Sequence, residues 1–148
     1  MIRANLLYVI KENKVLLIYK KKGHGKGLFN GIGGRIKKGE DIKESVIREA
    51  KEEVNIKVKD VIFCGKIDFD DEKGKWEVYV YKANNFEEKP KETKECRPVW
   101  FEIDKIPYDK MWPDDKYWLP LVFKNRKFNA FFKIRNMKIL EYSLIFNS

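Results

Sequence analysis

The sequence predicts one compact α/β domain, and three observations support this prediction. Short apolar segments typical of β-strands recur along the 148 residues. One long amphipathic segment and one shorter apolar segment are typical of helices. No repeat, low-complexity run or linker divides the chain, so we expect a single domain over residues 1–148.

Strands and turns come before the first predicted helix. Residues 6–10 and 14–20 are apolar runs separated by a tight turn, which predicts two strands. Residues 21–27 form a basic, glycine-rich loop, and residues 28–34 contain a short strand that ends in a turn. The chain is therefore expected to enter the helix from a glycine-rich segment.

The first helix is expected from about Asp41 to Val54. Asp41 and Glu44 form a D-x-x-E capping box at its start. Asn55 follows the helix, at a place where a left-handed residue is often needed and asparagine is tolerated. The expected buried stripe of this helix consists of Ile42, Val46, Ile47, Ala50 and Val54.

The rest of the chain is expected to be mostly strands. Residues 112–123 predict a short helix for which Asp114 is a plausible N-cap, and residues 84–93 are interpreted as a polar loop. The expected strands are residues 58–69 and 75–83 around a turn at 70–74, residues 96–103, and a hairpin of residues 127–134 and 138–146.

Charge and composition restrict the partners. The formal net charge is +9, and the lysines are spread along the chain, so we expect a solvated surface with a polyphosphate site and no stable nucleic-acid partner. The first residues lack a signal-peptide layout and are too short an apolar run to span a membrane. Cys64 and Cys96 form no CxxC motif, which favours free thiols in a reducing cytoplasm. A monomer is the default expectation.

Three carboxylates lie in the last two turns of the predicted helix, namely Glu49, Glu52 and Glu53. Acidic side chains at this end oppose the helix dipole, and Glu49 and Glu53 repel each other as i,i+4 neighbours. A cation between them would reverse both penalties. Because hard oxygen ligands suit Mg²⁺ held jointly with phosphates, the pattern predicts a phosphoryl-transfer or pyrophosphate-cleaving enzyme.

The same segment resembles a family motif. Gly34, five residues, Glu40, seven residues and then residues 48–56 (REAKEEVNI) resemble the box of the Nudix hydrolases. Two positions depart from the family pattern: Asn55 replaces a glycine, and Ala50 replaces a larger apolar residue. The resemblance implies the Nudix fold, an α/β/α arrangement with a mixed β-sheet sandwiched between helices.

The resemblance continues outside the box, towards the MutT-homologue branch of the family found in animals. It runs from about Leu6 to Leu144 and is strongest in residues 26–34, 95–107, 111–121 and 127–133. It implies Mg²⁺-dependent hydrolysis of oxidised purine nucleoside triphosphates, of the 8-oxo-dGTP and 2-hydroxy-dATP type, to the monophosphate and pyrophosphate. The implied partner is a small-molecule nucleotide.

The resemblance also assigns catalytic and metal-binding residues. Arg48 is expected to orient the acids by pairing with Glu44 or Glu52, and either Glu53 or Glu95 would activate the attacking water. Glu40 would stabilise the box. The implied ligands of Mg²⁺, or of Mn²⁺ in its place, are Glu49, Glu52, Glu53, Glu95 and the backbone carbonyl near Gly33.

A second group of residues is implied to recognise the base. It consists of Asn30, Trp112, Asp114 and Asp115, with Phe69 and Trp118 as walls of the pocket. Two adjacent carboxyls can share one proton and so both donate and accept. Lys20 would serve the triphosphate or the nucleoside, and His24 stands at the rim where the family has an aromatic residue. Taken alone, Asp114 fits an N-cap equally well, and Trp112 fits the core.

Two other functions remain open from the sequence. One keeps the Nudix chemistry with another substrate, namely ADP-ribose, a dinucleoside polyphosphate or a capped RNA. The other is a nucleotide-binding module without turnover, which the basic charge would also suit. The segment from Trp112 to Asp115 argues against the first, and the intact carboxylates of the box argue against the second.

Overall fold

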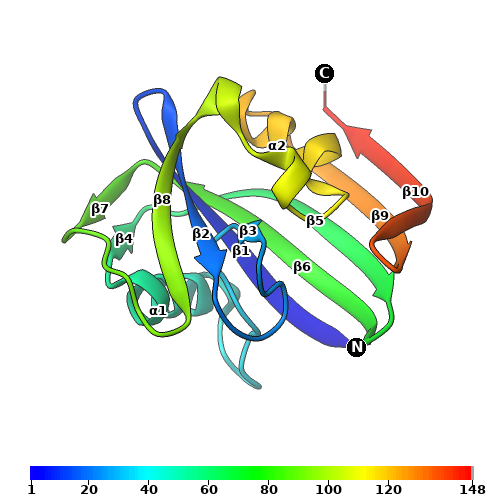
Figure 1. Ribbon diagram of the computed structural model, residues 1–148, viewed down its shortest axis with the longest axis horizontal. Coiled ribbons are helices and arrows are strands. Elements are labelled where there is room, and N and C mark those ends of the chain that lie inside the picture. Colours follow the sequence, from blue (N-terminus) through cyan, green and yellow to red (C-terminus); the bar gives the residue numbers. More distant parts are fainter. Residues whose placement is uncertain (148) are drawn as a thin grey trace.

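The computed structural model describes residues 1–147, which form one large β-sheet, a small two-stranded sheet and two α-helices (Figure 1). Short 3-10 turns lie at Ile103–Lys105 and Tyr108–Lys110. The helices are α1 (Ile42–Val54) and α2 (Asp115–Phe123). The strands are β1 (Ile2–Lys11), β2 (Lys14–Lys20), β3 (Phe29–Asn30), β4 (Lys57–Lys59), β5 (Ile62–Asp71), β6 (Gly74–Ala83), β7 (Asn85–Glu87), β8 (Cys96–Glu102), β9 (Phe128–Arg135) and β10 (Lys138–Phe146).

The large sheet is mixed, as expected. Its strands lie in the order β10-β9-β5-β6-β1-β2-β3, and β8 also pairs with β2. Strands β1 and β6 are parallel, as are β5 and β9, and the other pairs are antiparallel. The helices α1 and α2 lie on opposite sides of this sheet (Figure 1), which confirms the predicted α/β/α arrangement.

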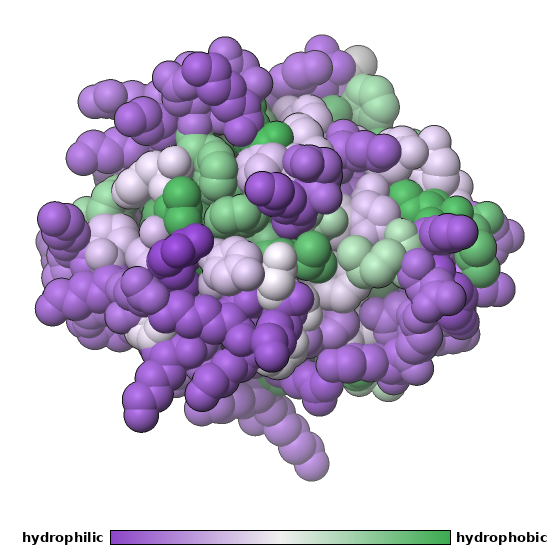
Figure 2. Space-filling model, viewed as in Figure 1, coloured by the Kyte–Doolittle hydropathy of each residue, from purple (hydrophilic) through white to green (hydrophobic). Residues whose placement is uncertain are grey.

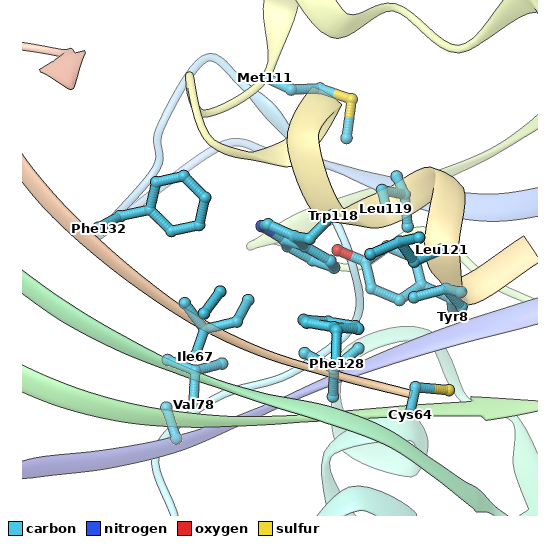
Figure 3. Packing of buried hydrophobic residues seen from close by; sticks show 14 of the residues in the cluster. Tyr8, Cys64, Ile67, Val78, Met111, Trp118, Leu119, Leu121, Phe128 and Phe132 are labelled. Atoms are coloured by element: carbon cyan, nitrogen blue, oxygen red, sulfur yellow. The ribbon is translucent and has the colours of Figure 1, made fainter. Parts of the chain in front are cut away.

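The two faces of the sheet are buried under different helices. Successive residues of a strand point to opposite faces, and both Leu7 and Tyr8 of β1 are buried. Leu7 belongs to the cluster that includes Val46 of α1, whereas Tyr8 belongs to the cluster that includes Trp118 of α2. Figure 3 shows this second cluster, in which the indole of Trp118 lies close to the rings of Tyr8 and Phe128. The sheet is therefore the middle layer of two cores.

The ends of α1 follow from its sequence. The carboxylate of Asp41 accepts a hydrogen bond from the backbone N–H of Glu44 at 3.2 Å, as the capping box predicts. Asn55 has a φ of 61°, and its N–H bonds to carbonyls of the last turn. Asparagine thus adopts the left-handed conformation that the position requires.

The buried face of α1 differs from the predicted stripe. Ile47 is 38% exposed, so its predicted burial is wrong, whereas Ser45 and Glu53 are buried. The helix is rotated towards its acidic edge because polar contacts hold it there. The amide of Asn5 donates to the hydroxyl of Ser45 at 2.7 Å, and Glu53 accepts a backbone hydrogen bond from the loop below.

Other boundaries also differ in detail. Residues 84–93, expected to be loop, contain β7, which pairs with β4. Asp114 directly precedes α2, but its side chain makes no capping hydrogen bond. Cys64 and Cys96 are free and buried. Within residues 1–147, neither helix has the length and apolar character needed to cross a bilayer.

We expect two neighbouring substitutions on α1 to lower the free energy of unfolding by different amounts. Val46→Ala should lower the free energy of unfolding by about 2 kcal/mol, because it removes two fully buried methyl groups. Ile47→Ala removes more apolar volume but should cost less than about 0.5 kcal/mol. Urea denaturation of both variants measures the difference, and an equal loss would contradict the observed rotation of the helix.

Candidate active site

The site begins where the glycine-rich segment meets α1. The N–H of Gly33 donates to Oε1 of Glu53 at 2.7 Å. A Cβ on Gly33 would lie 2.0 Å from the carbonyl oxygen of Asn5, and a Cβ on Gly34 would lie 2.7 Å from the carboxylate of Glu49. Both positions therefore need glycine, because the loop is pressed between β1 and the acidic edge of the helix.

Glu53 is held inside the protein. Only 6% of its surface is exposed, and its Oε2 accepts a hydrogen bond from the thiol of Cys96 at 3.1 Å. Burial raises the pKa of Glu53 to about 7, against the lowering effects of Cys96, Lys20 and the Gly33 N–H. The raised pKa means that these three groups compensate only part of the cost of burying the negative charge of Glu53.

Arg48 organises the acids on the outer side of α1. Its Nε donates to Glu40 at 2.7 Å, and its Nη2 donates to the other oxygen of the same carboxylate at 3.0 Å. Its Nη1 donates to Glu49 at 2.8 Å and to Glu52 at 3.0 Å. Of the two alternative partners expected for Arg48, Glu52 accepts from it, and Glu40, expected to stabilise the box, is a further partner. Arg48 thereby holds the carboxylates of Glu49 and Glu52 close together, because both accept from its Nη1.

The predicted metal ligands are partly brought together. Glu49, Glu52 and Glu53 lie on one helix end, while Glu95 is an exposed residue beside Cys96 on the neighbouring segment. In the described part of the chain, no three carboxylate, imidazole or thiol side chains already converge as a set of metal ligands. The donors nevertheless fit a hard divalent cation, because they are carboxylate oxygens and one of them is a buried, incompletely neutralised charge.

A cavity of about 550 Å³ lies beside this helix end. Figure 2 shows apolar side chains gathered near the middle of the face that carries β3 and α2, with hydrophilic side chains around them. Seven residues implied by the resemblance line the cavity, namely Lys20, Asn30, Gly33, Phe69, Trp112, Asp114 and Asp115. Trp118 does not line it, so its predicted role as a wall is wrong: it is fully buried behind Asp114.

Two buried carboxyls line the cavity. Asp114 and Asp115 are 2% and 5% exposed, and Oδ2 of Asp114 accepts from the indole Nε1 of Trp118 at 2.8 Å. Burial raises the pKa of both carboxyls, and the charge of Asp114 raises that of Asp115 further. Since adjacent like charges resist joint ionisation, the pair favours sharing one proton over carrying two charges.

Asn30 and Trp112 are coupled at the side of the cavity. The indole Nε1 of Trp112 donates to Oδ1 of Asn30 at 2.9 Å, and Nδ2 of Asn30 donates to the carbonyl of Leu28 at 3.1 Å. Both side chains line the cavity, so Trp112 belongs to the cavity wall and not to the core. The hydrogen bond fixes the plane of the indole.

Sequence reasoning missed three contributors. Trp76 lines the cavity, and the imidazole of His24 lies between Trp76 and Trp112, with ring centroids 5.1 Å and 4.8 Å apart. Cys96 bonds to Glu53, and Asn5 bonds to the Gly34 N–H at 3.4 Å. None of these belongs to a motif, and each acts through a contact between distant segments. The aromatic character of Trp76, next to a turn, is the only sequence feature that could have singled it out.

The fold and this arrangement of acids define a class of protein. The family model of the NUDIX domain matches residues 1–122, which is most of the chain. The chain belongs to the Nudix family.

Two named relatives and one solved structure narrow the comparison. The chain is 38% identical to the oxidized purine nucleoside triphosphate hydrolase of Danio rerio over 137 residues, covering 91% of this chain and 88% of that protein. It is 38% identical to the protein of the same name from Mus musculus over 142 residues, covering 94% and 91%. A mutator MutT protein from Bacillus halodurans superposes with a TM-score of 0.87 at 26% identity, covering 97% of each chain.

The raised pKa of Glu53 predicts that the free energy of unfolding of the metal-free protein depends on pH. A folded-state pKa above the ordinary 4.5 means that folding favours the protonated form, so stability falls as pH rises from about 4.5 to about 7. Relative to Glu53→Gln, the wild type should lose up to about 3 kcal/mol of unfolding free energy over this range. Denaturant titrations of both proteins with chelator present measure it.

Added Mg²⁺ provides the control for this experiment. Above about pH 7, Mg²⁺ should stabilise the wild type and leave Glu53→Gln nearly unchanged, because the ion needs the carboxylate. A wild type and variant with parallel pH profiles would show that burial does not perturb Glu53.

Proposed function

We propose that this protein hydrolyses oxidised purine nucleoside triphosphates, such as 8-oxo-dGTP, to the nucleoside monophosphate and pyrophosphate. One observation supports this most directly: the cavity of about 550 Å³ is lined both by the buried carboxyls of Asp114 and Asp115 and by Gly33, whose N–H holds the buried Glu53 of the acidic helix. A nucleotide bound there would have its base near the buried aspartates and its phosphates near the acidic end of α1. The names of the two relatives support the same substrate class.

The base-binding part of the proposal rests on hydrogen-bonding capacity. Asn30 offers an amide, and the pair of Asp114 and Asp115, whose pKa values burial raises, would share a proton and so both donate and accept. A purine edge presents both donors and acceptors, so this set can satisfy either type. Oxidation changes the hydrogen-bonding groups on the edge of the base. A base that leaves one of the buried polar groups of the protein without a partner binds less tightly. Trp112 supplies a flat face for stacking.

Lys20 connects the two parts of the site. It lines the cavity, and its charge acts on Glu53 and on Cys96. A cation at this point suits the α-phosphate or the bridging oxygen of a nucleotide whose base lies in the cavity. We therefore assign Lys20 to the phosphates.

The acidic helix end would hold Mg²⁺ through Glu49, Glu52 and Glu53, with Glu95 and the carbonyl of Gly33 as further ligands. When bound, the ion supplies charge neutralisation for the phosphate oxygens and a more acidic water. The protein groups have their own tasks. Arg48 keeps Glu49 and Glu52 in place, and either Glu53 or Glu95 would orient or deprotonate the attacking water.

A substrate panel tests the proposal. With Mg²⁺ present, kcat/KM should be higher for 8-oxo-dGTP and 2-hydroxy-dATP than for dGTP and dATP, with pyrophosphate as product. Glu53→Gln should lower kcat by about 100-fold or more, because the helix end loses its buried charge. Glu44→Gln is the matched control: it lies on the exposed side of the same helix and should keep wild-type activity.

Three results would contradict the proposal. Equal or faster turnover of ADP-ribose, a dinucleoside polyphosphate or a capped RNA would assign another Nudix substrate. Tight nucleotide binding without pyrophosphate release would favour a binding module. Full activity in Glu53→Gln would remove the acidic helix end from the chemistry.

Asp114→Asn should separate base recognition from the metal site. We expect kcat/KM for the oxidised purine to fall about tenfold or more, since an unmatched buried polar group costs about 1–3 kcal/mol. The Mg²⁺ concentration for half-maximal activity should stay at the wild-type value, because Asp114 precedes α2 and bonds to Trp118, whereas Glu53 belongs to α1. An equal change in both quantities would contradict the division into two parts.

A further inference from the structure

A single imidazole stands between two indoles at the mouth of the cavity. The ring of His24 stacks on Trp112 with an interplanar angle of 27° and on Trp76 with an angle of 22°. The two tryptophans come from different parts of the fold, one from β6 and the other from the segment before α2. Together they form a slot that takes one flat ring.

Both walls of the slot are fixed by hydrogen bonds. The indole Nε1 of Trp112 donates to Asn30 at 2.9 Å, and that of Trp76 donates to Oδ1 of Asp71 at 3.0 Å. Trp76 is only 8% exposed, so it cannot swing away without losing core contacts. The slot is therefore preorganised, and its width does not depend on what occupies it.

His24, by contrast, is carried on a loop that is suited to move. It is an exposed residue flanked by Gly23 and Gly25, whose φ values are 75° and 85°. Partial desolvation of the imidazole and the nearby charge of Lys73 lower its pKa, against the raising effect of Asp71, and so favour the neutral ring. The occupant of the slot is thus a flat, uncharged aromatic ring, which is the chemistry of a nucleobase.

We propose that His24 occupies the place of the base when no nucleotide is bound, and that a purine entering the cavity displaces it and stacks between Trp76 and Trp112. His24 is thus a built-in competitor of the substrate, and Trp76 is the second wall of the base site. The inference relies on the proposed function only in taking a purine as the ligand. It explains why both indoles are held by hydrogen bonds while the ring between them is not.

The chain offers a direct probe, because His24 is its only histidine. In the proton NMR spectrum of the free protein, the imidazole signals should lie upfield of those of an exposed histidine, owing to the two neighbouring indoles. Addition of 8-oxo-dGMP, a ligand that is not turned over, should move them downfield as the ring leaves the slot. An unshifted signal in the free protein, or one that stays upfield at saturation, overturns the proposal.

Affinity gives an independent readout. His24→Ala should tighten the Kd for 8-oxo-dGMP by roughly two- to tenfold, the equilibrium factor of one aromatic pair, because no ring must be displaced. In a Trp76→Leu background the same change should have little effect, since one wall of the slot is gone. Lys26→Ala, an exposed substitution on the same loop, is the control and should leave Kd unchanged.

Weaker binding by His24→Ala would make His24 a permanent wall of the base site and overturn the proposal, as would an unchanged Kd. The test is separable from that of the proposed function. The prediction of an upfield imidazole signal in the free protein can be tested without turnover. Its outcome does not depend on which triphosphate is hydrolysed. Conversely, an enzyme active on 8-oxo-dGTP with an unshifted histidine would refute only the displacement of His24.

Discussion

The hydrogen bond between the Gly33 N–H and Glu53 is the contact on which the arrangement of the site depends. It turns α1 so that a carboxylate, and not Ile47, lies at the buried face. A buried carboxylate costs stability unless it is bonded, and here one oxygen accepts from a backbone amide and the other from the thiol of Cys96. The same bond sets the acidic helix end beside the cavity, because Gly33 lines that cavity.

Carboxyl groups take two different roles within a short distance, and their surroundings decide which. Glu53 lies near Lys20 and a backbone donor, so its charge is partly supported and a cation completes it. Asp115 is buried beside Asp114, with Tyr8 and Tyr108 also near it, and burial and the charge of Asp114 raise its pKa. On the proposed function, the first carboxylate would attract metal and phosphate, while the aspartate pair would present a shared proton to a base. The separation follows from burial and neighbours, not from residue type.

The sequence predicted what local rules control. The strands, the capping box of α1 and the left-handed Asn55 follow from periodicity and from residues near in the chain. The exposure of Ile47 was not predicted from the sequence, because Asn5 and Gly33, which lie on other segments, determine the rotation of the helix. For the candidate site, spacing pointed to the acids, but the base residues came from the resemblance. The contact of Trp76 with His24 left no local trace in the sequence.

Stacking and edge recognition divide the task of binding a base. An indole face attracts any purine, since every base has a flat π-surface, so the slot of Trp76 and Trp112 adds affinity with little discrimination. Selection between an oxidised and a normal purine must come from groups that meet the edge, where Asn30 and the buried aspartates lie. A ring that already fills the slot lowers the affinity for all purines alike. If His24 is displaced as proposed, only a base that also bonds to these edge groups recovers that loss, and occupancy of the site then depends on the edge contacts.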